Sequence, residues 1–89
     1  MVRKTSPQTA KSECNLIGLS ADEAISELDN FLDGAVLGNL SQVRIVHGMG
    51  TGKLRAAVKE FLRKDPRVAE FRLGVYGEGE SGVTIVTLK

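Results

Sequence analysis

The sequence is poor in the residues that mark disulfide frameworks, metal sites and base-stacking surfaces. Its 89 residues include one cysteine, one histidine, two prolines, one tyrosine and no tryptophan. A single cysteine excludes an internal disulfide and a cysteine-rich zinc site, and with one histidine we predict no metal site built from protein ligands alone. No apolar run approaches the ~20 residues of a membrane span. A soluble protein of a reducing compartment, the cytoplasm, fits these absences.

The net charge is close to zero, which excludes a histone-like binder of polyanions. Lys and Arg number 12 against 11 Asp and Glu, so the formal charge is +1. A chain of this length buries roughly 60 to 65% of its unfolded surface, which permits one modest core. We therefore expect one domain over residues 13–89. Residues 1–12 are polar and aperiodic, and we expect a flexible leader there, either a linker from a longer chain or a remnant of expression.

The apolar pattern predicts a βαβαββ order of elements. Ser20-Ala21-Asp22-Glu23 has the form of a capping box that begins a helix, and Gly38 stops it. A second helix starts around Gly52 or Lys53 and ends at Asp65-Pro66. Strands are expected at residues 14–19, 43–46, 68–73 and 83–88, with a glycine-rich turn over 77–82 and with residues 75 and 76 in either the third strand or that turn.

These elements predict a small two-layer α/β sandwich with a four-stranded mixed sheet. Right-handed crossovers place both helices on one face of the sheet. The other face is then partly open, for a partner or for a larger parent chain. Phe31, Phe61 and Phe71 fall at periodic apolar positions and are expected in the core, which leaves Tyr76 as the one aromatic side chain for base stacking.

The charges are separated along the chain. Residues 15–43 carry five acidic and no basic side chains, for a charge of −5. Residues 44–72 carry eight basic and three acidic side chains, for a charge of +5. The first helix is therefore an acidic surface and the second a basic one. Either both are ordinary solvated faces, packed side by side for mutual attraction, or the basic half binds an anionic partner.

The segment His47-Gly48-Met49-Gly50-Thr51-Gly52-Lys53 lies where a strand ends and a helix begins. Alternating glycines let backbone N–H groups point outward together, and the helix N-terminus adds unpaired donors and partial positive charge. Lys53 and Arg55 add full charges, so a phosphate is the simplest occupant. The alternative is a tight strand-to-helix connection whose glycines only satisfy backbone geometry.

Two known phosphate motifs fail here. The Walker pattern needs glycine where His47 stands and Ser or Thr where Leu54 stands, and the Rossmann fingerprint needs glycine where Lys53 stands. Nucleotide hydrolysis and dinucleotide binding are therefore not expected, and the ligand that remains is a phosphate on a larger polymer. His47 is either a structural residue of this connection or a general acid or base, since an imidazole gains and loses protons near neutral pH.

Three segments together resemble the signatures of the Smr (small MutS-related) domain family, over residues 13–89. They are Cys14-Asn15-Leu16-Ile17-Gly18-Leu19-Ser20-Ala21-Asp22-Glu23-Ala24, the loop His47-Gly48-Met49-Gly50-Thr51-Gly52, and Gly77-Glu78-Gly79-Glu80-Ser81-Gly82-Val83-Thr84-Ile85-Val86. The ending resembles in particular the C-terminal domain of the second bacterial MutS paralogue. The resemblance implies a fold like the C-terminal domain of translation initiation factor three.

The resemblance also implies site residues. His47 is the expected catalytic residue, and Gly48, Met49, Gly50, Thr51 and Gly52 are the expected nucleic-acid-binding residues, with Lys53 and Arg55 beside them on physical grounds. Asn15, Gly18, Gly79 and Ser81 are expected to flank the site. The first family motif usually has Asp where this chain has Asn15 and a basic residue where it has Ile17. Asparagine cannot ionise to act as a base, and isoleucine cannot donate to a phosphate.

The function implied is nucleic-acid binding with nicking of branched or structured DNA, in suppression of recombination or in repair, within a larger MutS-like ATPase. One alternative is a non-catalytic module that binds DNA, RNA or the ribosome and serves in rescue of collided ribosomes. Another is a protein-interaction or dimerisation domain that uses the acidic first helix. No cofactor is expected in the domain itself, with Mg²⁺ or Mn²⁺ as the metal for cleavage. The expected partners include no membrane, and the parent protein is expected to be a homodimer through regions absent here.

Overall fold

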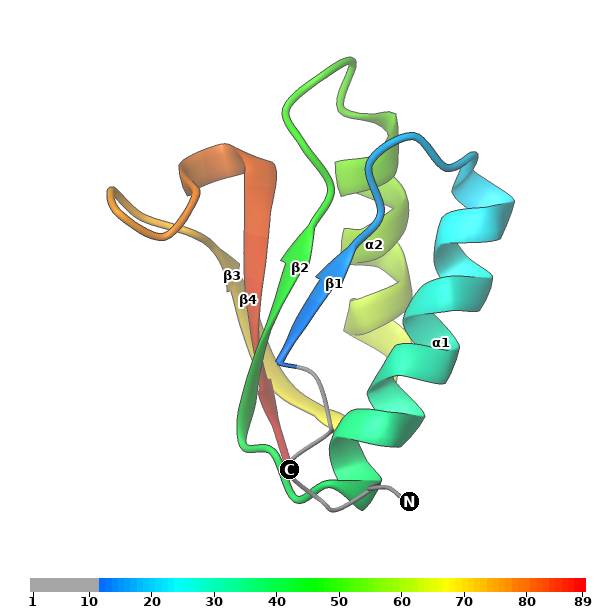
Figure 1. Ribbon diagram of the computed structural model, residues 1–89, viewed down its shortest axis with the longest axis vertical. Coiled ribbons are helices and arrows are strands. Elements are labelled where there is room, and N and C mark those ends of the chain that lie inside the picture. Colours follow the sequence, from blue (N-terminus) through cyan, green and yellow to red (C-terminus); the bar gives the residue numbers. More distant parts are fainter. Residues whose placement is uncertain (1–11) are drawn as a thin grey trace, which may run out of the picture.

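The computed structural model describes residues 12–89, in which two helices pack on one face of a sheet (Figure 1). The sheet order is β1-β2-β4-β3, with β1 parallel to β2 and the other two pairs antiparallel. The elements are β1 (Glu13–Asn15), α1 (Ala21–Leu37), β2 (Gln42–Val46), α2 (Lys53–Lys64), β3 (Val68–Leu73), a 3-10 turn η2 (Glu80–Gly82) and β4 (Val83–Leu88). The predicted two-layer, mixed-sheet fold is confirmed. The leader expected at residues 1–12 lies, except for Ser12, outside the described residues.

Helix α1 begins at the predicted capping box. The Ser20 hydroxyl accepts from the Glu23 N–H at 3.2 Å, and the Ser20 N–H donates to the Glu23 carboxylate at 2.9 Å. The helix ends at Gly38, whose N–H bonds back to Gly34 and Val36 carbonyls. Both ends of α1 therefore follow from local side-chain and backbone chemistry.

Strand β1 is shorter than the expected range of 14–19. Asn15 turns the chain, because its side-chain oxygen accepts the N–H of Ile17 at 2.9 Å. Gly18 then adopts a positive φ of 93°. Leu16 still donates its N–H to the Val46 carbonyl at 2.7 Å and is fully buried. It therefore continues the packing of β1, although the regular strand ends at Asn15.

The core lies between the sheet and the helices. It takes alternate residues of each strand, such as Val43 and Ile45 of β2, and one face of each helix, such as Leu28 of α1 and Leu62 of α2. The three phenylalanines expected in the core are partly buried and pack against its rim. Over residues 12–89, neither helix has the length and apolar character to cross a bilayer.

Arg67 joins the acidic helix α1 to the end of the basic helix α2. Its guanidinium contacts Asp29 and Asp33 of α1 and Asp65 at the C-terminus of α2, at 2.8, 2.8 and 2.6 Å. The Asp65 side chain is 5% exposed, and its hydrogen bonds to Arg67 hold its pKa below the usual range. The two helices of opposite charge thus lie side by side, tied at one end by a single arginine.

The sheet face turned away from the helices is covered by charged side chains. Ile85 of β4 is 5% exposed on this face, opposite Arg44 of β2 and Arg72 of β3. Arg44 bonds Glu13 at 2.9 Å, and Arg72 bonds Glu78 at 2.7 Å. The aliphatic stems of such arginines cover apolar surface while their heads stay in water. The face expected to be open is therefore shielded at its centre.

Candidate functional site

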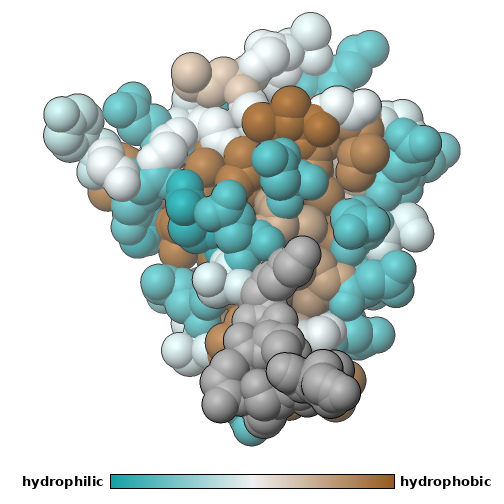
Figure 2. All heavy atoms as spheres, viewed as in Figure 1, coloured by the Kyte–Doolittle hydropathy of each residue, from teal (hydrophilic) through white to brown (hydrophobic). Residues whose placement is uncertain are grey.

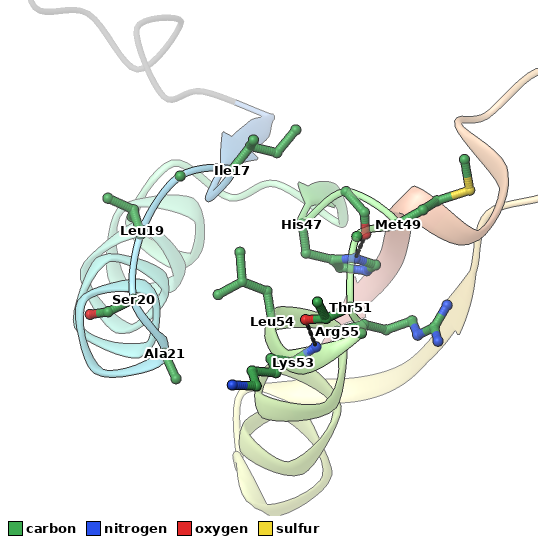
Figure 3. A pocket seen from close by; sticks show the side chains of 14 residues that line it. Ile17, Leu19, Ser20, Ala21, His47, Met49, Thr51, Lys53, Leu54 and Arg55 are labelled. Carbon is green, nitrogen blue, oxygen red and sulfur yellow. Dashed lines mark hydrogen bonds between the residues drawn. The ribbon is translucent and has the colours of Figure 1, made fainter.

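A groove of about 510 Å³ lies at the end of the sheet where β1 and β2 finish (Figure 3). Its two walls are residues 17–21, which connect β1 to the first residue of α1, and residues 47–55, which include the β2–α2 loop and the first turn of α2. We call it the loop groove. It contains Gly18 and all the predicted loop residues: His47, Gly48, Met49, Gly50, Thr51, Gly52, Lys53 and Arg55.

Hydrophobic surface gathers at this end of the molecule. Figure 2 shows it as brown spheres in the upper part of the view, with hydrophilic residues on both flanks. Ile17 and Met49 are 59% and 62% exposed. A Cβ added at Gly48 would lie 3.4 Å from Ile17 Cγ1, so the Ile17 side chain packs close to the glycine loop on the other wall of the groove. The position that is basic in the family motif therefore forms an apolar edge here.

Helix α2 begins without a side-chain cap. Gly52 precedes it with a φ of 86°, a conformation that favours glycine, and the Lys53 N–H reaches only the Thr51 hydroxyl at 3.4 Å. Within residues 12–89, no hydrogen bond engages the backbone N–H groups of Gly50, Thr51, Gly52, Leu54 and Arg55. Unpaired donors at a helix N-terminus attract anions.

Two cations stand at this helix terminus. Figure 3 shows Lys53 and Arg55 extending to opposite sides of the first turn of α2. A Cβ at Gly52 would lie 3.3 Å from Arg55 Nη2, so the guanidinium folds back over the glycine. Neither cation forms an ion pair in the part of the chain that the structure describes, and the residues lining the loop groove include no Asp or Glu. The groove is therefore electropositive, as a phosphate site requires.

His47 is 4% exposed and both of its ring nitrogens have partners inside the protein. Nδ1 lies 2.9 Å from the Gly48 carbonyl oxygen, and Nε2 lies 2.8 Å from the Thr84 hydroxyl. A carbonyl can only accept, so Nδ1 carries a hydrogen, and in the neutral ring Nε2 accepts from Thr84. Proton transfer to a substrate, the role predicted for His47, requires one of these bonds to open.

The base of the loop is anchored to Gly82, the residue just before β4. The Gly82 carbonyl accepts the N–H groups of both His47 and Gly48, at 3.0 and 2.9 Å. Sequence reasoning placed Gly79 and Ser81 beside the site, but neither lines the loop groove. Gly79 instead lies against Val83, where an added Cβ would meet its side chain at 2.3 Å. Gly82, the last residue of the same predicted glycine-rich turn, makes the contact with the loop.

Asn15, the other predicted flanking residue, does not line the groove either. Its side chain is occupied by the N–H of Ile17, and it thereby fixes the β1–α1 turn that forms one wall. Asn15 therefore positions a wall of the loop groove without lining the groove itself.

A second groove, of about 450 Å³, runs between α2 and β3. Gly52 and Arg55 line both grooves, and the other lining residues of this one are Ala56, Lys59, Phe71, Arg72, Leu73 and Thr84. We call it the strand groove. The spacing of Arg55 and Lys59, one helical turn apart, was the one signal of it in the sequence.

Neither metal ligation nor thiol chemistry fits these residues. Over residues 12–89, no group of three or more His, Cys, Asp or Glu side chains is placed to hold a metal ion. The loop groove has no carboxylate in its lining, and the nitrogens of His47 are engaged, so its side chains do not suit Mg²⁺ or Mn²⁺. Cys14 is buried, which raises the pKa of its thiol to about 11.

Known proteins resemble this chain in sequence over most of its length. The family model of the Smr domain matches residues 14–89. A protein of Agathobacter rectalis named Endonuclease MutS2 is 49% identical over 88 residues, which cover 99% of this chain and 11% of that protein. An Endonuclease MutS2 of Caldicellulosiruptor bescii is 56% identical over 72 residues, 81% of this chain and 9% of that protein. The chain thus spans about a tenth of these curated relatives.

Two solved structures share the fold. The crystal structure of the Smr domain of Thermus thermophilus MutS2 is 46% identical with a TM-score of 0.86, covering 88% of this chain and 98% of that one. The stand-alone small MutS-related protein YdaL from Escherichia coli is 25% identical with a TM-score of 0.79, covering 88% of this chain and 64% of that one.

Proposed function

The chain belongs to the Smr domain family, and we propose that it binds the phosphate backbone of DNA in the loop groove, as the DNA-binding part of an endonuclease. One observation carries the proposal. The unpaired N–H groups of the first turn of α2 meet the side chains of Lys53 and Arg55 in a groove whose lining has no acidic residue. That combination suits a phosphate diester, which offers several acceptor oxygens and one negative charge.

The binding is backbone recognition with few contacts. Lys53 and Arg55 extend to two sides of one helix terminus, so they reach about two phosphates. Each neutralised phosphate of a duplex contributes a slope of about 0.9 in the dependence of log affinity on log salt. The acidic helix α1 beside the groove repels DNA elsewhere and confines the contact to this edge.

Binding to duplex DNA at several salt concentrations tests this function. We expect the double variant Lys53→Ala, Arg55→Ala to lower the affinity and to reduce the salt slope by about 2. Lys64→Ala is the matched control, because Lys64 lies at the other end of α2 and outside both grooves. Unchanged affinity and slope in the double variant would overturn the proposal.

Nicking of the bound strand is the second candidate function. It is supported by the curated relatives that carry the name Endonuclease MutS2 and by the position of His47 in the lining of the loop groove. In this proposal His47 leaves Thr84 or the Gly48 carbonyl when the strand binds, and its imidazole moves a proton during phosphodiester hydrolysis. The broader role, in recombination or repair within a MutS-like ATPase, belongs to this candidate.

Relaxation of supercoiled plasmid, with and without Mg²⁺ or Mn²⁺, tests the nicking. We expect nicking by the purified domain and its loss in His47→Ala. A domain that binds DNA without nicking it, under every metal condition, would exclude this candidate. Tighter binding to structured RNA or to ribosomes than to DNA would favour the alternative, a non-catalytic module for collided ribosomes.

A further inference from the structure

The strand groove extends the electropositive surface beyond the loop groove. Arg55 and Lys59 lie one turn apart on α2 and form its basic wall. Neither forms an ion pair within residues 12–89, and no Asp or Glu lines this groove. The acidic residue next to Lys59 is Glu60, which is engaged by Arg63 and Lys64. The positive charge of this wall is therefore available to an anionic partner.

The floor of the strand groove is apolar and contains a phenyl ring. Phe71 pairs with Val86 and Leu73 pairs with Thr84 across the β3–β4 ladder, which places both side chains on the helix-facing side of the sheet. Phe71 is half-buried, and Leu73 is 45% exposed. Phe71 is the one Phe, Tyr or Trp side chain in the lining of either groove.

We propose that the strand groove holds a single strand of nucleic acid that continues from the phosphate bound in the loop groove. The inference rests on the proposed function of the loop groove. Arg55 and Lys59 contact successive phosphates, and an unpaired base lies on Phe71 and Leu73. Gly52 and Arg55 line both grooves, so one strand passes between them without leaving the surface.

The apolar floor selects the single strand over the duplex. The faces of bases in a duplex are stacked on each other, and only an unpaired base presents its face to a side chain. Stacking of this kind tolerates any sequence, because every base has an apolar face. The domain is thus suited to nucleic acid with unpaired nucleotides beside a backbone contact, as at a branch, a gap or a flap.

Fluorescence anisotropy tests the proposal with a labelled thymine dodecamer and with a random duplex of equal length. Lys59→Glu and Leu73→Asn alter the wall and the floor of the strand groove. Lys64→Glu makes the same charge change on the same helix outside both grooves. Lys53→Glu alters the loop groove. A thermal melt of each variant checks that it is folded.

We expect Lys59→Glu and Leu73→Asn each to weaken single-strand binding about five- to tenfold and duplex binding less than about twofold. Lys64→Glu leaves both within about twofold. Unchanged single-strand binding, or equal losses for strand and duplex, would overturn the strand-groove proposal. Loss of duplex binding in Lys53→Glu is the separate outcome that the loop groove requires. Its absence would overturn the proposed function itself.

Discussion

Replacement of Thr84 by valine isolates the hydrogen bond that holds His47 in place. Thr84 is 3% exposed on β4, and its hydroxyl lies 2.8 Å from His47 Nε2. Valine has nearly the same shape and favours strands, so the substitution removes the hydroxyl without opening a cavity. What remains is a buried imidazole nitrogen without a partner.

The expected cost follows from that orphaned nitrogen. A net hydrogen bond contributes about 1 kcal/mol, and leaving a buried polar group unpaired costs about 1 to 3 kcal/mol. We expect Thr84→Val to lower the free energy of unfolding by about 2 kcal/mol, and the midpoint of thermal unfolding by about 8 to 16 °C. Thr87→Val is the matched control. It lies on the same strand but on the opposite face, away from His47, and should change stability by less than about 0.5 kcal/mol.

Urea unfolding of the single and double variants with His47→Ala provides the decisive measurement. Once the imidazole is gone, the hydroxyl has lost its partner, so Thr84→Val should cost much less in the His47→Ala background. A cost under about 0.5 kcal/mol in the wild-type background, or an equal cost in both backgrounds, would refute the reasoning. That result would also mean that His47 can transfer a proton without first breaking its hydrogen bond to Thr84.

The other predictions concern ion pairs of the fold and the buried thiol of Cys14. Arg67→Ala should lower the free energy of unfolding, measured by urea denaturation, by about 2 to 3 kcal/mol, because it leaves the nearly buried carboxylate of Asp65 without its partner. Arg63→Ala, whose partner is exposed, should cost less than about 1 kcal/mol. Hydrogen bonds from Arg72 lower the pKa of Glu78 to about 2. The stabilisation from Glu78 is therefore fully present above its ordinary pKa of 4.5 and is lost progressively as the pH falls from there through about 2. A carboxyl NMR titration will follow the folded-state pKa, and a midpoint near 4.5 would contradict the ion pair. Cys14 should resist a thiol reagent at pH 8 in the native state and react in urea; rapid native reaction would contradict its burial.

The sequence predicted the elements whose signals are local. Strands β3 and β4 lie at 68–73 and 83–88 as expected, because both lie between turn-forming segments and β4 is rich in β-branched residues. Helix α1 begins at its capping box and ends at Gly38, as predicted. Strand β1 is shorter than predicted, because the Asn15 side chain competes for the N–H of Ile17. An apolar run alone does not reveal that competition.

The part of the loop groove that comes from one continuous segment of sequence could be predicted. Residues 47–53 and Arg55 line the loop groove because the β2–α2 loop carries them there together. The burial of His47 was not predictable, since its partner Thr84 is 37 residues away. The strand groove was missed for a similar reason, because it depends on how far α2 stands from β3. The predicted roles of the groove residues stay predictions.

The order of the strands has a consequence for the synthesis of this domain. The last strand along the chain, β4, lies between β2 and β3, so neither of these has its inner neighbour until residues 83–88 have left the ribosome. The anchor of the β2–α2 loop, Gly82, emerges just before it. A nascent chain that stops short of β4 therefore exposes two unpaired strand edges and an unformed groove. We therefore expect the proposed nucleic-acid binding to require that β4 has been synthesised and has joined the sheet.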